Sequence, residues 1–115
     1  KIIFIPTPNN PTGNNFNFEA IELLIQRFPG IVVVDEAYAE FSSNSSVIPW
    51  LLKYPNLMVC QTFSKAQGMA GARLGMAFAH RDFINFFIEL MASAEGLEAH
   101  KNAVSIRLKT LKDEI

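Results

Sequence analysis

The chain has 115 residues, of which 50% are hydrophobic and 18% are charged, and its formal net charge is −1. This composition is typical of one modest globular domain and excludes a disordered chain. The small net charge gives no reason to expect nucleic acid or an anionic membrane as a partner, and no apolar stretch approaches the ~20 residues that span a bilayer. The single cysteine cannot form an internal disulfide, so we expect a cytoplasmic location.

Residues 2–5 (IIFI) form a continuously apolar run, which predicts a short buried strand. The stretch after it, PTPNNPTG, is rich in proline, asparagine and glycine and predicts a fixed loop. Apolar residues then recur at helical spacing over positions 18–28, with Asn17 as a candidate N-cap, and a Pro-Gly pair ends this helix. Residues 31–34 (IVVV) predict a second buried strand, closed by Asp35.

The second half of the chain continues the alternation of helices and strands. A short helical segment is expected at 48–53, a third apolar run (NLMVCQTF) at 56–63 and a fourth (GMAFA) at 75–79. Two helices follow, one strongly apolar over about 82–94 and one amphipathic over 97–115. This order predicts right-handed crossovers and a mainly parallel sheet with both faces covered, so the predicted fold class is α/β, a three-layer α/β/α architecture.

Polar side chains follow three successive strands and recur before the fourth. They are Asn9 and Asn10 after the first, Asp35 and Tyr38 after the second, Thr62, Ser64 and Lys65 after the third, and Arg73 beyond a glycine-rich loop. Each alone has a structural explanation, such as turn chemistry for an Asn-Pro pair. Because the carboxyl ends of parallel strands lie along one edge, where ligands bind, their recurrence predicts one shared site.

Several other polar residues are expected to be structural. Cys60 lies in an apolar run and is interpreted as a core residue, while a surface turn of helix is the structural explanation for Glu36 and Glu40, and for Tyr38 taken alone. His80 and His100 are far apart in sequence and have no ligand-like spacing with other histidines or cysteines, so no metal site is expected.

The residue types at these strand ends match the chemical needs of pyridoxal 5'-phosphate (PLP). Its aldehyde condenses with a lysine, and its ring nitrogen stays protonated beside a carboxylate. Its phenolic oxygen needs hydrogen-bond donors, and its phosphate suits hydroxyls and an arginine. The sequence supplies a candidate for each need, whereas a phosphate-binding loop of the form GxxxxGK[ST] does not occur.

Three motifs in order, PNNPTG, VVVDEAY and TFSKAQGMAGARLG, resemble the cofactor-binding core of fold-type I PLP-dependent aminotransferases, and within them the histidinol-phosphate aminotransferases. The resemblance covers residues 1–84, which would be part of the large PLP-binding domain of the aspartate aminotransferase-like fold. Residues 85–115 would be a helical continuation, which we do not match to the family. Members of the family are homodimers roughly three times this length. The resemblance therefore implies a piece of a longer protein that does not turn over alone.

The resemblance implies a role for each catalytic residue. Lys65 would bind the cofactor covalently and serve as the general base. Asp35 would pair with the pyridine nitrogen, and Tyr38 with Asn10 would hydrogen-bond the phenolic oxygen. These assignments make Lys65, Asp35 and Tyr38 the expected catalytic residues.

The phosphate would be held by Thr62, Ser64 and Arg73, again by resemblance. The small residues after the lysine would leave space for the cofactor. Gly71 and Gly75 are expected to let the backbone turn so that the arginine returns to the phosphate.

The implied reaction is transamination from glutamate to imidazole acetol phosphate, which yields L-histidinol phosphate in histidine biosynthesis. An aromatic amino acid aminotransferase or a threonine-phosphate decarboxylase would share all of these residues. From other classes, a non-catalytic aminotransferase-like ligand-sensing domain of a regulator and a purely structural α/β domain remain as alternatives.

Overall fold

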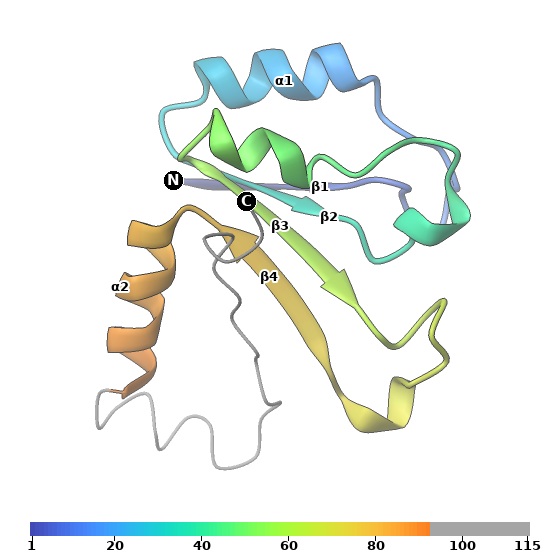
Figure 1. Cartoon of the computed structure of the whole chain (residues 1–115). Coiled ribbons are helices and arrows are strands. Elements are labelled where there is room, and N and C mark those ends of the chain that lie inside the picture. The colour runs from blue at the N-terminus through green and yellow to red at the C-terminus, as the bar shows by residue number, and fades with distance from the viewer. Residues whose placement is uncertain (93–115) are drawn as a thin grey trace.

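The computed structural model describes residues 1–92 (Figure 1). In chain order its strands (β), α-helices (α) and 3-10 helices (η) are β1 (Ile2–Pro6), α1 (Phe18–Arg27), β2 (Ile31–Asp35), η1 (Ala39–Phe41), η2 (Ile48–Leu52), β3 (Leu57–Thr62), η3 (Ala70–Ala72), β4 (Gly75–Ala79) and α2 (Arg81–Ala92). The four predicted strands and the helix after Asn17 are confirmed. The helix predicted over 82–94 begins at Arg81, and the amphipathic helix predicted over 97–115 lies outside the described residues.

The four strands form one sheet in the order β1-β2-β3-β4. The first three run parallel, and β4 runs antiparallel to β3. This reversal follows from the connection over residues 63–74, which has only the short η3 turn and no α-helix to return the chain to the other end of the sheet. The predicted α/β class with a mainly parallel sheet is confirmed.

The main hydrophobic core lies between one face of the sheet and the segments α1 and η2, which lie together on that side (Figure 1). The alternation of side chains along the strands sends every second residue to this face. The buried cluster consists of Ile5, Ile21, Ile25, Val32, Val34, Val47, Leu51, Tyr54, Leu57 and Val59. Burying each of its larger side chains contributes about 1.5–3 kcal/mol. The Asn17 side chain caps α1 by accepting a hydrogen bond from the Ala20 N–H at 3.0 Å.

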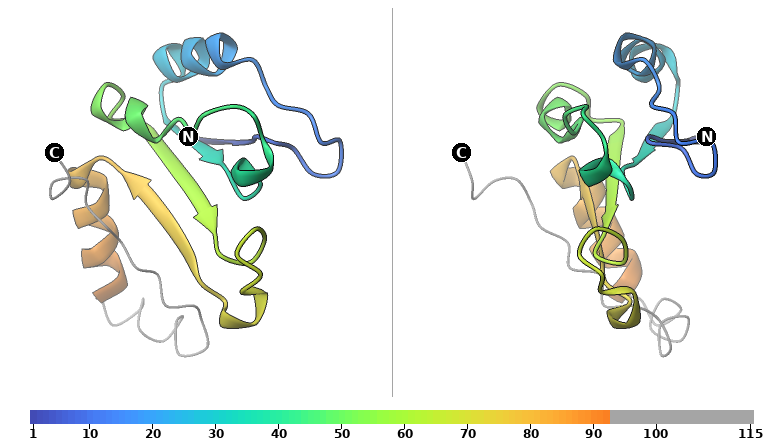
Figure 2. Two further views of the ribbon diagram at one scale, coloured as in Figure 1. Left: turned by 45° about the vertical axis from the view of Figure 1, so that its right-hand side comes forward. Right: turned by 90° about the vertical axis from the view of Figure 1, so that its right-hand side faces the viewer.

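The second face of the sheet carries α2, which lies on the opposite side from α1 and next to β4 (Figure 2). Ile84 of α2 and Ala79 of β4 are both buried. At the other edge Ile2 and Phe4 remain 59% and 70% exposed, so the expected cover of this face does not extend to β1 in the described chain. No helix within residues 1–92 has the length and apolar character that a membrane crossing needs.

The ends of the parallel strands are level with one another. Pro6 pairs with Asp35, and Asp35 pairs with Cys60. Backbone bonding continues beyond the strands, because the Thr7 N–H donates to the Asp35 carbonyl at 2.9 Å and the Glu36 N–H donates to the Cys60 carbonyl at 2.8 Å. The loops that leave these strands therefore start from a rigid common edge.

Candidate functional site

The candidate site lies at this common edge. The strand β4 begins there because Gly75 pairs with Thr62, so the loop between β3 and β4 returns to the side from which it left. The arrowheads of β2 and β3 point toward the side where these loops gather (Figure 1). Polar residues from all three parallel strand ends are thus delivered to one side of the molecule, as the sequence predicts.

Three of the predicted residues meet around the phenol of Tyr38. The Asn10 Nδ2 donates a long hydrogen bond of 3.5 Å to the Tyr38 hydroxyl. The Lys65 Nζ lies 5.1 Å from the centroid of the Tyr38 ring, which is a cation–π geometry. These contacts join the ends of β1, β2 and β3. The remaining asparagine, Asn9, instead donates within its own loop to Thr12 at 2.6 Å.

Asp35 occupies the last position of β2 and is half-buried. Its Oδ1 accepts a hydrogen bond from the Ala37 N–H at 2.9 Å, while its other oxygen has no hydrogen bond within residues 1–92. Burial raises the pKa of the Cys60 thiol, and the charge of the neighbouring Asp35 raises that pKa further. The carboxylate is therefore close to β3, and one of its oxygens is available to a ligand. Cys60 itself is half-buried at this end of β3 rather than enclosed in the core.

Thr62 and Ser64 lie where the loop leaves β3. The Thr62 hydroxyl accepts from the Ser64 N–H at 3.1 Å and donates to the Leu74 carbonyl at 3.5 Å, so it links the two ends of the loop. Arg73 precedes Leu74 and is exposed. Its guanidinium makes no ion pair in the described part of the chain. The two hydroxyls and the arginine therefore belong to the same loop closure.

The turn of this loop uses different residues from those expected. Gly68 and Arg73 have φ angles of 65° and 51°, in the left-handed region, whereas Gly71 does not. The expectation for Gly71 was wrong, because a side chain there would meet no atom within 4 Å. Gly75 serves close approach instead, since a Cβ at this position would lie 3.2 Å from the Gln61 carbonyl oxygen. The left-handed conformation of Arg73 is costly for a residue with a side chain.

The predicted site residues fall into two separate groups of contacts. One group surrounds Tyr38, and the other surrounds Thr62 at the loop closure. A hollow of about 240 Å³ opens beside Tyr38 and is lined by Pro8, Asn9, Asn10, Pro11, Gly13, Asn15, Tyr38 and Phe41. Lys65, Asp35 and Arg73 are not part of its lining, so one pocket shared by all predicted residues stays a prediction.

Glu36 is a residue that sequence reasoning misplaced. It was expected on a surface turn, but only 3% of it is exposed and its carboxylate accepts three hydrogen bonds. The alternation of side chains along β2 could have predicted this burial, because Glu36 follows the buried Val34 by two positions and so lies on the core face. Glu40 is exposed, as expected.

Two solved structures of similar fold are named as an aminotransferase and a decarboxylase. A candidate histidinol-phosphate aminotransferase from Erwinia carotovora atroseptica SCRI1043 is 37% identical with a TM-score of 0.71, covering 80% of this chain and 28% of that protein. An L-threonine-O-3-phosphate decarboxylase from Porphyromonas gingivalis is 26% identical, also with a TM-score of 0.71, covering 85% of this chain and 32% of that protein.

Curated relatives carry the first of these names. A histidinol-phosphate aminotransferase of Cytophaga hutchinsonii is 43% identical over 100% of this chain and 34% of its own length. A histidinol-phosphate aminotransferase 2 of Idiomarina loihiensis is 50% identical over 80% of this chain and 26% of its own length. The matched part thus spans about a quarter to a third of the length of these relatives. The predicted domain limit at residue 84 stays a prediction. The profile of the family described as aminotransferase class I and II matches residues 1–105, and the chain belongs to that family.

Proposed function

We propose that the protein is a PLP-dependent aminotransferase and that the strand-end residues hold its cofactor. The observation that carries this proposal is the placement of the Lys65 ammonium over the Tyr38 ring, with Asn10 on the same phenol. A lysine fixed in this way at the end of a buried strand has a rigid base and a free amine. Within residues 1–92 that amine makes no ion pair or hydrogen bond, so it remains available to an aldehyde.

The donor and acceptor set fits PLP. The uncommitted oxygen of Asp35 can accept the ring N–H, and the Tyr38 hydroxyl with Asn10 can face a phenolic oxygen. The Arg73 guanidinium offers a two-pronged donor for a phosphate, together with the hydroxyls at the start of the same loop. Bound PLP supplies an aldehyde for covalent attachment and a ring that withdraws electrons from the bond to be broken.

Each residue of the chain has a distinct task in this scheme. The Lys65 Nζ holds the cofactor and, when released, takes and returns protons as a general base. The Asp35 carboxylate favours the protonated form of the ring nitrogen by charge. Tyr38 orients the amine through its ring and stabilises a neighbouring oxygen through its hydroxyl.

The relatives favour a particular pair of substrates. We infer that the complete protein transfers the amino group of L-glutamate to imidazole acetol phosphate, which gives L-histidinol phosphate and 2-oxoglutarate. This inference is supported by two relatives that are 43% and 50% identical to this chain, because both are named as histidinol-phosphate aminotransferases. A cytoplasmic homodimer and an inactive isolated chain are parts of the same proposal.

A second candidate is decarboxylation of threonine phosphate. It is favoured by one observation, the TM-score of 0.71 to the Porphyromonas gingivalis decarboxylase, which equals the value for the Erwinia protein. The two functions leave different products, because only the aminotransferase yields 2-oxoglutarate from glutamate and only the decarboxylase releases carbon dioxide.

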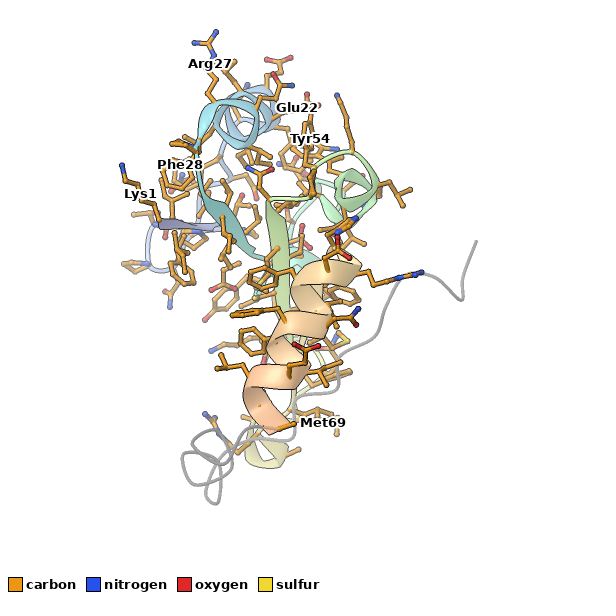
Figure 3. All side chains as sticks on the ribbon, turned by 90° about the vertical axis from the view of Figure 1, so that its left-hand side faces the viewer. Lys1, Glu22, Arg27, Phe28, Tyr54 and Met69 are labelled. Carbon is orange, nitrogen blue, oxygen red and sulfur yellow. The ribbon has the colours of Figure 1, made fainter. Side chains whose placement is uncertain are left out.

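The test uses the protein expressed from its complete gene and loaded with PLP. We expect an absorption band above ~400 nm from the lysine-bound cofactor, and we expect borohydride reduction to fix the cofactor on Lys65. Lys65→Ala should abolish both signals. Lys53→Ala is the matched control, because that lysine pairs with Glu22 at 2.9 Å. The Glu22 and Tyr54 side chains lie at the end of the molecule away from Met69 in the β3–β4 loop (Figure 3). A cofactor that stays attached in Lys65→Ala would refute the assignment.

A further inference from the structure

The buried carboxylate of Glu36 joins three separate segments. Its Oε2 accepts from the Ser46 hydroxyl at 2.7 Å and from the Gln61 Nε2 at 2.9 Å, and its Oε1 accepts from the Val47 N–H at 2.8 Å. The donors come from the segment before η2, which covers the core, and from the penultimate residue of β3. Such a buried charge is tolerated because each of its oxygens is hydrogen-bonded.

The position of this carboxylate places it behind the candidate site. Glu36 directly follows Asp35, and Gln61 directly precedes Thr62. Because side chains alternate between the two faces of a sheet, Glu36 and Gln61 meet on the core face while Asp35 and Thr62 project to the other face. The Glu36–Gln61 hydrogen bond therefore joins β2 to β3 at the last step before each loop begins.

We propose that Glu36 is a positioning residue, whose carboxylate fixes Asp35 of β2 relative to the β3 loop that carries Lys65. This inference rests on the proposed function. The backbone alone provides one tie at this level, the 2.8 Å bond from the Glu36 N–H to the Cys60 carbonyl, and the side-chain bond adds a second on the core side. The paired backbones of β2 and β3 already fix the strand ends, and the side-chain bond holds the first residue beyond β2 against β3, where the strand pairing ends.

The carboxylate suits this task better than an amide of the same shape. In Glu36→Gln one oxygen can still accept from the Val47 N–H, but the new NH₂ group faces two donors. Ser46 can turn its hydroxyl to accept. The Gln61 side chain must either rotate away or reverse its amide, and after reversal its oxygen accepts from the new NH₂ group, which leaves only a neutral hydrogen bond about half as strong. The substitution thus preserves volume and most bonds and acts chiefly on the tie between β2 and β3.

The experiment compares four forms of the protein from its complete gene. They are the wild type, Glu36→Gln, the swap Glu36→Gln/Gln61→Glu, and the control Glu22→Gln. In the swap, the amide at position 36 donates to the carboxylate at position 61, so the tie returns with its polarity reversed. Glu22 accepts from the Lys53 Nζ at 2.9 Å and from the Tyr54 hydroxyl at 2.6 Å, at the end of the molecule away from the β3–β4 loop, so its substitution removes hydrogen bonds to a carboxylate far from the site (Figure 3).

Three readings are taken on each form: the dissociation constant of PLP, the pH midpoint of the absorption band above ~400 nm, and the unfolding temperature without cofactor. We expect Glu36→Gln to weaken PLP binding roughly threefold to tenfold, because the charged hydrogen bond to Gln61 is lost or becomes a neutral one, and to shift the pH midpoint. The swap should recover most of the affinity and most of the midpoint shift, and Glu22→Gln should keep the affinity and midpoint of the wild type. A midpoint shift that the swap reverses is not a consequence of lower stability alone.

The outcomes separate this inference from the proposed function. If the wild type shows the band and Glu36→Gln keeps its affinity and midpoint, the positioning role is overturned while the function stands. A folded swap that remains as impaired as the single variant also overturns it. If the wild type never shows the band, the proposed function fails and the inference fails with it.

If Glu36→Gln does not fold, a second variant, Gln61→Met, still tests the positioning role. Gln61→Met removes only the donor from β3 and leaves the bonds from Ser46 and Val47 to Glu36 in place. We expect this variant to fold and to bind PLP about threefold to tenfold more weakly, as for one lost hydrogen bond. Unchanged affinity in Gln61→Met would overturn the inference.

Discussion

Replacing Arg73 with glycine should change stability and PLP affinity in opposite directions. Arg73 has a φ of 51°, a left-handed conformation that costs a residue with a Cβ about 1–2 kcal/mol. Glycine removes that cost but adds about 0.5–1 kcal/mol of chain entropy to the unfolded state. The net expectation for the cofactor-free protein is a gain of about 0–1.5 kcal/mol in the free energy of unfolding.

The same substitution removes the guanidinium that we assign to the phosphate. A hydrogen bond to a charged group contributes about 1.5–3 kcal/mol, so PLP affinity should fall roughly tenfold to 150-fold. Denaturant unfolding of the cofactor-free protein measures the first quantity, and equilibrium titration with PLP measures the second. Arg73→Lys is the control, because it keeps the strained backbone and the charge but loses the two-pronged donor. A clear loss of stability with unchanged PLP affinity would refute the phosphate assignment and make Arg73 a structural residue.

Three further predictions concern other parts of the described chain. Asn17→Ala removes the side-chain cap of α1 and should lower the free energy of unfolding by about 1 kcal/mol in denaturant titration. Asp35→Asn removes a charge that raises the pKa of Cys60, so alkylation of that thiol at pH 8, followed by peptide mass spectrometry, should become faster; an unchanged rate would show that burial alone sets the pKa. The hydrogen bond from Tyr54, and after it the one from Lys53, lowers the pKa of Glu22 below 4.5 in the folded protein. The ionised Glu22 therefore stabilises the fold above that pH, and this stabilisation is lost as the pH falls through the folded pKa. Glu22→Gln should therefore reduce the loss of stability between pH 6 and pH 3, and an equal loss in both proteins would contradict this.

The periodic parts of the fold could be predicted from the sequence because their signals are local. The helical spacing after Asn17 predicts α1, and the apolar run at 31–34 predicts β2, since burial alone decides these elements. The strand-end rule likewise predicted that Asn10, Tyr38 and Lys65 would approach one another, although they are far apart in sequence.

The remaining features depend on distant contacts that no local pattern records. The left-handed turn at Arg73 arises because the loop must close onto β3, and a sequence rule assigns such turns to glycine first. The burial of Glu36 depends on hydrogen-bond donors that are distant in sequence, from Ser46, 10 positions away, to Gln61, 25 positions away. A charged residue after a strand is more often exposed, so only the alternation of the strand argued for burial.

That alternation links the core to the site. On β2 the residues at 32 and 34 face the core together with Glu36, while Asp35 faces the other side, and on β3 the same rule separates Gln61 from Thr62. A slip of one residue in either strand would turn its site residue into the core and its apolar residues outward, so the packing that fixes the register also fixes which side chains reach the ligand edge. The hydrophobic cluster therefore determines the position of Asp35, and the Glu36 carboxylate, which is buried on the same face of the sheet as that cluster, connects this end of β2 to β3 through Gln61.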